Sequence, residues 1–203
     1  MSLNGYTHIA TKPAPGAPLV FTFHGTGGDE HQFPGLIRRM LPDAGIVSPR
    51  GDVSEYGANR FFRRRAEGVY DMDDLAERTA KMAGFIGAHA DANPGAPVYG
   101  LGYSNGANIL ASVLLEAPEL FDRVVLMHPL IPWNPEPNAA LQSREILITA
   151  GRHDPISPLP LTESLSRHLS GQGAAVELLL HEGGHEIRQE EIDAITAFLR
   201  GDR

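Results

Sequence analysis

Short apolar runs alternate along the chain with longer amphipathic segments, and this alternation limits the architectures that the chain can adopt. Runs such as Leu19–Phe23, Val98–Leu101 and Ile146–Thr149 are bounded by turn residues, which is typical of buried strands. Between them, apolar residues recur at helical spacing, as from Leu75 to His89. Strands that alternate with helices favour a mostly parallel central sheet with helices on both faces, which is an α/β fold.

The same patterns predict the remaining elements. Further strands are expected at Gly45–Val47, Arg123–Met127 and Val176–Leu180, with an added edge strand at Tyr6–Ala10. Further helices are expected at Asn105–Glu116, from Leu161 to Leu169 and from Ile187 to Leu199. The 203 residues contain no internal repeat and no linker, so we expect one domain over residues 1–203. Its sheet should have about seven strands.

Composition excludes several classes of function. The formal net charge is −8, from 17 basic and 25 acidic residues, and a negative protein repels phosphate backbones, so we expect no nucleic-acid partner. The absence of cysteine excludes disulfides and thiolate chemistry. The segment from Met1 to Pro18 lacks the pattern of a signal peptide, and no apolar run approaches the roughly 20 residues of a membrane span. We therefore expect a soluble, cytoplasmic protein.

The segment Gly102-Tyr103-Ser104-Asn105-Gly106 matches the pattern G-x-S-x-G between an expected strand and an expected helix. A serine on such a sharp turn adopts a strained backbone conformation, and the flanking glycines allow the neighbouring backbone to pack closely. Free N–H groups at the start of the helix then point toward the reacting oxygen. Ser104 is therefore the candidate nucleophile.

A dinucleotide-binding loop is the alternative interpretation of the same glycines. Gly100, Gly102 and Gly106 follow a strand, but their spacing differs from G-x-G-x-x-G. The next strand ends in His128 rather than in an acid that would bind ribose. The hydrolase interpretation is favoured.

Candidates for the acid and the base follow two later strands, in the order that such hydrolases use. Asp154 is the carboxylate just past the strand Ile146–Thr149, although an aspartate before proline is also a common turn residue. His185 lies in a glycine-bearing loop past the strand Val176–Leu180, from which it can reach the serine. We predict that Asp154 orients His185 and that His185 activates Ser104.

The segment from His181 to His185 also matches the zinc-protease pattern H-E-x-x-H. That pattern binds zinc only on a helix, where residues four apart share one face. The two intervening residues are glycines, which together disfavour a helix by about 2 kcal/mol, and the preceding residues predict a strand. No metal site is expected.

The loop after the first core strand, Phe23-His24-Gly25-Thr26-Gly27-Gly28, is the candidate oxyanion loop. Its alternative is a phosphate-binding loop, but it lacks the lysine and the spacing of a P-loop. The backbone N–H groups of Thr26 and Asn105 are the expected oxyanion donors.

These segments together resemble the small carboxylesterase/phospholipase branch of the α/β-hydrolases, over nearly the whole chain. Ser48-Pro49-Arg50-Gly51, followed by Arg60-Phe61-Phe62-Arg63-Arg64, further resembles a bacterial subgroup of hydroquinone-resistance-associated hydrolases. The resemblance implies a carboxylesterase that acts on small-molecule esters and needs no cofactor. No long insertion follows the strand Arg123–Met127, so no large cap domain is expected. Related small esterases are often dimers, which makes a homodimer the expectation from the resemblance.

Substrate-binding residues are assigned on weaker grounds. Phe61, Phe62 and Trp133 can supply apolar walls, or they can be core residues. Arg63 or Arg64 can bind an acidic group, and the basic segment from Arg60 to Arg65 can equally be a solvated turn. Thioesterase, peptidase and non-catalytic ligand-binding functions remain open alternatives, because the same residues serve the first two and the fold alone serves the third.

Overall fold

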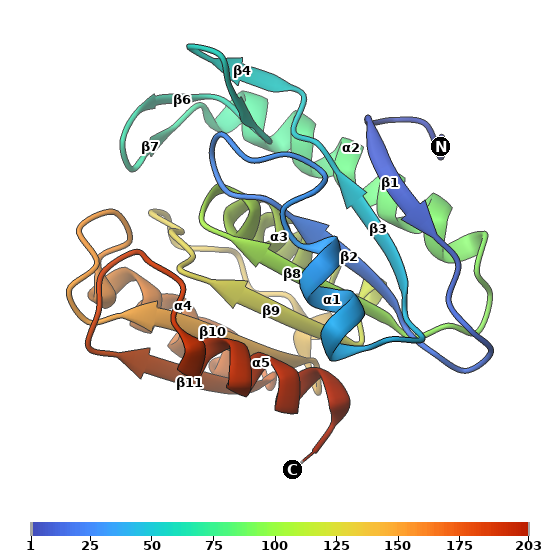
Figure 1. Ribbon diagram of the computed structural model, residues 1–203. Helices are drawn as coiled ribbons and strands as arrows, with labels where there is room; N and C mark the ends of the chain where they lie inside the picture. Colours follow the sequence, from blue (N-terminus) through green and yellow to red (C-terminus); the bar gives the residue numbers. More distant parts are fainter. Residues whose placement is uncertain (1, 203) are drawn as a thin grey trace.

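A seven-stranded sheet forms the centre of the computed structural model, which describes residues 2–202 (Figure 1). Residues 1 and 203, which the sequence assigns to the same domain, lie outside this range. The strand order is β1-β3-β2-β8-β9-β10-β11, in which only the edge strand β1 is antiparallel to its neighbour. The strands are β1 (His8–Thr11), β2 (Leu19–Phe23), β3 (Gly45–Pro49), β8 (Val98–Tyr103), β9 (Arg123–Met127), β10 (Glu145–Gly151) and β11 (Ala175–His181).

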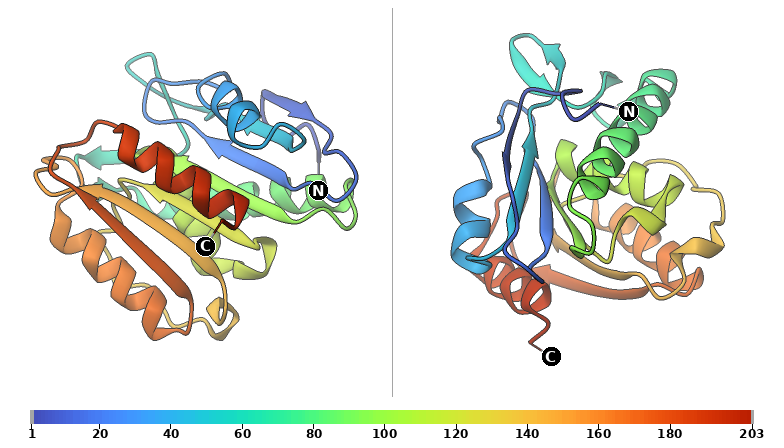
Figure 2. Two further views of the ribbon diagram at one scale, coloured as in Figure 1. Left: turned by 60° about the horizontal axis from the view of Figure 1, so that its bottom comes forward. Right: turned by 90° about the vertical axis from the view of Figure 1, so that its right-hand side faces the viewer.

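Helices cover both faces of this sheet, as expected (Figure 2). On one face lie α1 (Pro34–Met40) and α5 (Gln189–Arg200), and on the other lie α2 (Met72–Asp91), α3 (Asn105–Glu116) and α4 (Leu159–Gly171). Each layer of helices buries its own apolar cluster against the sheet. Within residues 2–202, no helix combines the length and the apolar character that a membrane crossing requires.

Every strand predicted for the central sheet is present, and several extend beyond their predicted ends. The apolar pattern does not reveal the short helix α1 or the two small hairpins between β3 and α2. The hairpins consist of β4 (Val53–Glu55) with β5 (Ala58–Arg60) and β6 (Arg64–Ala66) with β7 (Val69–Tyr70). Their strands have only two or three residues each, too few to show an alternating apolar pattern.

The parallel strands align their carboxyl ends along one edge of the sheet, where ligand sites form in open α/β folds. The loops that follow β2, β8, β10 and β11 therefore meet there. Close packing holds them together: a Cβ atom at Gly151, which ends β10, would overlap the carbonyl oxygen of Gly184. Only glycine at position 151 allows the loop after β11 to approach β10 this closely.

Candidate active site

Ser104 occupies the turn between β8 and α3 with φ 52° and ψ −119°, a conformation that residues with a side chain rarely adopt. A Cβ atom at Gly102 would lie 2.6 Å from the carbonyl oxygen of Gly106, and one at Gly106 would overlap the carbonyl oxygen of Phe23. The structure confirms the strained turn and the tight backbone packing that the motif predicts.

The three side chains predicted to act together form one hydrogen-bonded line. Ser104 Oγ lies 2.8 Å from His185 Nε2, and His185 Nδ1 lies 2.7 Å from Asp154 Oδ2. The other oxygen of Asp154 accepts the backbone N–H groups of Ile156 and Ser157 at 2.8 and 2.9 Å. With Asp154 held on both oxygens, Nδ1–H of His185 donates to the carboxylate and Nε2 faces the serine hydroxyl.

Tyr103, the second residue of the motif, fixes the position of the histidine loop. Its hydroxyl donates to the carbonyl oxygen of His185 at 2.7 Å, and its ring centroid lies 5.4 Å from that of His185. The pattern G-x-S-x-G leaves this position free, so the sequence carries no signal for the role of Tyr103.

Two backbone N–H groups beside Ser104 are available to an oxyanion. Asn105 begins α3, so its N–H has no partner within the helix. Thr26 N–H forms no hydrogen bond with any residue from 2 to 202. His24 holds the Thr26 loop in place, because its Nδ1 donates to the Gly25 carbonyl at 2.7 Å and its Nε2 accepts from Gly51 N–H at 2.9 Å. Burial lowers the pKa of His24, which agrees with this neutral form.

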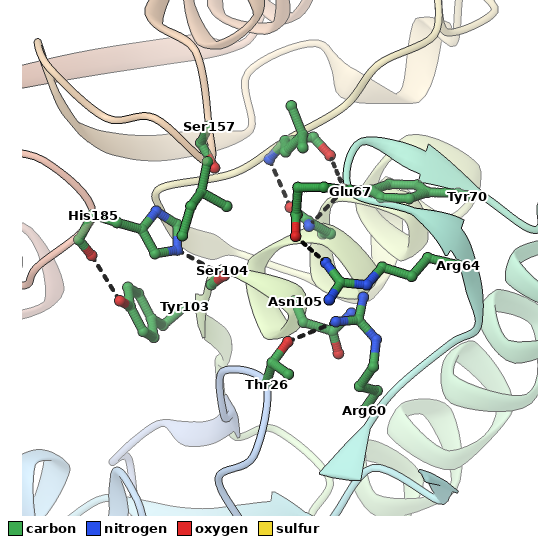
Figure 3. A pocket seen from close by; sticks show the side chains of 13 residues that line it. Thr26, Arg60, Arg64, Glu67, Tyr70, Tyr103, Ser104, Asn105, Ser157 and His185 are labelled. Atoms are coloured by element: carbon green, nitrogen blue, oxygen red, sulfur yellow. Dashed lines mark hydrogen bonds and ion pairs between the residues drawn. The ribbon is translucent and has the colours of Figure 1, made fainter. Parts of the chain in front are cut away.

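Ser104 opens into a pocket of about 300 Å³ (Figure 3). His185 lies on one side of the serine, and the arginines of the two hairpins lie on the other. The lining residues are Thr26, Arg60, Arg64, Glu67, Tyr70, Tyr103, Ser104, Asn105, Asn108, Leu130, Ile156, Ser157 and His185.

None of the four residues assigned tentatively to substrate binding lines this pocket. Phe61 and Phe62 are fully buried in the apolar core, because the chain between the two hairpins turns both rings inward. Trp133 packs against the same core, with its ring centroid 6.1 Å from that of Tyr70. The structure therefore corrects these three assignments: the aromatic side chains belong to the apolar core, or pack against it, and do not line the pocket.

The fourth assignment, Arg63, is corrected for a different reason. Its side chain is 59% exposed and pairs with Asp74 at 3.1 Å, beside the start of α2. In the same segment, Arg60 and Arg64 line the pocket instead. The basic segment is thus part of the site, through Arg60 and through Arg64, the residue that the sequence named as the alternative to Arg63.

The fold and this geometry have counterparts among known proteins, although no protein-family model matches the chain. MhqD of Bacillus subtilis (strain 168), which is named as a hydrolase, is 37% identical over 178 residues, covering 86% of this chain and 88% of MhqD. A carboxylesterase from Bacillus cereus is 32% identical, with a TM-score of 0.90 over 98% of this chain and 95% of that one. The chain belongs to the carboxylesterase-type family of α/β-hydrolases, in the MhqD subgroup.

Another member of this fold, the protein Atu2452 of unknown function from Agrobacterium tumefaciens strain C58, is 54% identical. Its structure matches with a TM-score of 0.93 over 99% of this chain and 98% of that one. The match to the Bacillus cereus carboxylesterase, together with the strand order and the helices on both faces, confirms the α/β-hydrolase fold without a large cap. After β9, the chain reaches β10 through one loop and a single short helical turn, η2 (Ala139–Leu141).

Behind Asp154 lies His128, which follows β9 and is fully buried. Its Nδ1 is 2.9 Å from Asp154 Oδ2, and its Nε2 is 3.1 Å from Glu191 Oε1. A carboxylate oxygen can only accept, so both ring nitrogens donate and His128 is held as the imidazolium. Burial by itself would lower the pKa of His128, but the hydrogen bonds with Glu191 and Asp154 outweigh it and raise the pKa.

Glu191, at the start of α5, completes this buried group. Its carboxylate also accepts from Thr149 Oγ1 at 2.6 Å and from the backbone N–H of Arg188 at 2.7 Å. Nε2 of His181 lies 3.2 Å away, outside hydrogen-bond geometry. His128 could have been suspected from the sequence, because it ends a strand at the same edge as the other site residues. The role of Glu191 depends on the register of α5 and had no such signal.

The structure also bears on the zinc alternative. His181 ends β11 and Nδ1 of its ring accepts from Gly183 N–H, whereas His185 turns toward Ser104. The residues between them form a loop, so the two histidines do not share a helical face. Ligand atoms of His128, His181 and Glu191 do lie within 4.8 Å of one another. The hydrogen bond between His128 and Glu191 accounts for that arrangement without a metal.

Glu191→Gln is expected to lower the free energy of unfolding by about 3 kcal/mol at pH 7, because the amide nitrogen would face N–H or O–H donors on whichever side it lies. Burial alone would raise the pKa of Glu191, but the hydrogen bonds from His128 and Thr149 outweigh it, so the pKa lies below its ordinary range. The stabilisation is therefore present above the ordinary pKa of about 4.3 and is lost as the pH falls through the lower pKa of the folded state.

Urea denaturation of the wild type and the variant between pH 7 and pH 3 measures this difference. The difference in the free energy of unfolding between the wild type and Glu191→Gln should become smaller below about pH 4.3. Glu190→Gln is the matched control, because Glu190 is the adjacent residue and is exposed. A Glu191→Gln variant as stable as the control at pH 7 would contradict the prediction.

Proposed function

We propose that the protein hydrolyses carboxylic esters through an acyl-enzyme on Ser104, with His185 as the base and Asp154 as the acid. The observation that carries this proposal is the unbroken line from Ser104 Oγ to His185 at 2.8 Å and from His185 to Asp154 at 2.7 Å. These distances are those of a nucleophile and its base within hydrogen-bond reach, with a third group that orients the base.

The reaction follows from the positions of these atoms. As Ser104 Oγ attacks the carbonyl carbon, Nε2 of His185 takes the hydroxyl proton. The N–H groups of Thr26 and Asn105 donate to the oxygen that becomes negative. When the tetrahedral intermediate collapses, His185 gives its proton to the leaving alcohol. Water then attacks the acyl-enzyme by the same route, and the acid is released.

The buried group behind the triad adjusts the charge balance of this step. Asp154 and Glu191 are anions and His128 is a cation, so the group carries one net negative charge when His185 is neutral. Proton transfer to His185 brings the total to zero. A charge that forms next to an existing opposite charge in a buried, low-dielectric site is stabilised more than it would be in water.

The kind of bond that is cleaved is inferred from the pocket and the relatives together. A pocket of about 300 Å³ suits a short acyl group. The Bacillus cereus relative is a carboxylesterase, which favours esters over thioesters and peptides. A non-catalytic role would leave the strained conformation of Ser104 without a purpose.

A phosphonate ester probe tests the proposal directly. An activated serine attacks the phosphorus of such a probe and expels its leaving alcohol, which leaves a phosphonyl group on the serine, and peptide mass spectrometry should find this adduct on Ser104. Ser157→Ala, which removes another serine that lines the pocket, should still be labelled, and Ser104→Ala should not. A folded protein that resists the probe, or that hydrolyses esters only until a chelator is added, would overturn the mechanism.

A further inference from the structure

The two hairpins between β3 and α2 place a pair of cationic side chains in the candidate active site. Arg60 ends β5 and Arg64 begins β6, and both line the pocket that contains Ser104. Figure 3 shows their guanidinium groups close together beside Thr26 and Asn105. Two like charges in one small pocket repel each other, so their pairing requires an explanation.

Arg60 is buried, with only 4% of its side chain exposed. Its Nη1 donates to Thr26 Oγ1 at 2.8 Å, and its Nε donates to the carbonyl oxygen of Phe62 at 3.3 Å. The carboxylate nearest to it, Glu55, is 3.6 Å away. Arg60 therefore has no carboxylate within hydrogen-bond distance among residues 2–202. Burial lowers the pKa of Arg60 and the charge of Arg64 lowers it further, whereas Glu55 acts in the opposite direction.

Arg64 takes most of the available negative charge. It donates from Nε to both oxygens of Glu55, at 3.0 and 3.2 Å, and it also pairs with Glu67. The Glu67 side chain is 56% exposed and lines the same pocket. Exposed ion pairs of this kind are weak and exchange readily with water or another anion.

Donors without partners face the same region. Nη2 of Arg60 forms no hydrogen bond with any residue from 2 to 202. Nδ2 of Asn105 is buried and also has no partner, because its Oδ1 accepts from Phe61 N–H and fixes the amide orientation. Buried donors are normally satisfied, so this side of the pocket suits a ligand rich in acceptors.

The arginines lie on the side of Ser104 opposite His185, where we expect the acyl group of a bound ester (Figure 3). The leaving alcohol must lie near His185, which protonates it, and the oxyanion must lie between the Thr26 and Asn105 N–H groups. Arg60 contacts Thr26 on the side away from His185 (Figure 3). An acyl chain that extends from Ser104 away from His185 therefore runs toward Arg60 and Arg64.

We propose, on the basis of the ester-hydrolase function above, that Arg60 and Arg64 bind a carboxylate at the far end of the acyl group. The preferred substrates are then half-esters of short dicarboxylic acids. The substrate carboxylate takes the place that Glu67 occupies in the free protein, and Glu67 moves into solvent. A planar carboxylate fits the paired donors of guanidinium groups, and the small pocket limits the chain to a few carbons.

The test compares two ethyl esters of similar shape. Monoethyl succinate carries a carboxylate where ethyl levulinate carries a neutral methyl ketone. With hydrolysis followed by pH-stat titration at low salt, kcat/KM should favour monoethyl succinate by about tenfold or more. Arg64→Gln should lower this ratio by about tenfold. Glu67→Gln should raise it, because Arg64 then loses a competing carboxylate.

Arg65→Gln is the matched control, because it removes the same charge as Arg64→Gln at a residue that is exposed and lies outside the pocket. The ratio of kcat/KM for the two esters should be the same in this variant as in the wild type. If the hairpin had only a structural role, Arg64→Gln and Glu67→Gln would not change this ratio in opposite directions. The subsite is overturned if the wild type hydrolyses both esters equally well, or if Arg64→Gln keeps the wild-type ratio. Failure to hydrolyse either ester, with no phosphonate adduct on Ser104, would instead overturn the hydrolase function itself.

Discussion

Ser104→Ala is expected to lower kcat/KM for ester hydrolysis by about 10⁴-fold or more, because among residues 2–202 no other hydroxyl is hydrogen-bonded to the ring of His185. In the wild type, residue 104 has φ 52° and is flanked by the closely packed Gly102 and Gly106, so we expect the variant to keep this backbone conformation. The oxyanion donors therefore stay in place, and some residual activity from binding and from those donors should persist. Steady-state kinetics on a p-nitrophenyl ester of a short acid gives the measurement.

Ser157→Ala is the control for this experiment. Ser157 also lines the pocket, but its hydroxyl donates to the carbonyl oxygen of His128 at 3.0 Å and does not contact His185. Its loss should change activity far less. If both variants kept wild-type activity, the nucleophile would have to be a group other than Ser104.

Asp154→Asn is expected to lower kcat by about 10⁴-fold, because the histidine would lose the acceptor that fixes its tautomer. One oxygen of Asp154 accepts from His185 and His128, and the other accepts two backbone N–H groups. Whichever way an asparagine turns, its amide NH₂ meets two donors. The stability should fall as well, since His128 would lose one of its two carboxylates.

Kinetics and thermal denaturation, measured on the same preparation, separate these two effects. The rate should fall even at temperatures at which the variant is fully folded. Asp91→Asn, at an exposed position at the end of α2, provides the control for the change of one charge. A folded Asp154→Asn variant with nearly normal kcat would remove Asp154 from the mechanism.

Much of the candidate site could be predicted because its parts follow a rule of sheet topology. Thr26, Ser104, Asp154 and His185 each follow a strand that the apolar pattern reveals, and parallel strands bring such residues to one edge. The local geometry also matches the prediction from the motif, because the glycines of G-x-S-x-G are needed for close backbone packing. His128 also follows a strand at this edge, but in the sequence it served only to argue against a dinucleotide-binding site, because it stands where a ribose-binding acid would be expected.

The segment between β3 and α2 was not predictable to the same degree. Side chains on short extended segments alternate between faces, so a shift of one residue reverses which of them point inward. Phe61, Phe62 and Arg63 were assigned to the pocket, whereas Arg60 and Arg64 on either side of them line it. The hairpins are too short for an apolar period to determine that register.

The sequence by itself determined the α/β-hydrolase fold, the strained turn at Ser104 and the order of the residues around it, because these depend on periodic apolar patterns and on local glycine geometry. Only the tertiary structure decided which side chains complete the site. Glu191 is hydrogen-bonded to His128, 63 residues away in the sequence, and Thr26 accepts a hydrogen bond from Arg60, 34 residues away. Such contacts depend on how helices and hairpins pack against the sheet, and a local pattern of neighbouring residues does not predict that packing.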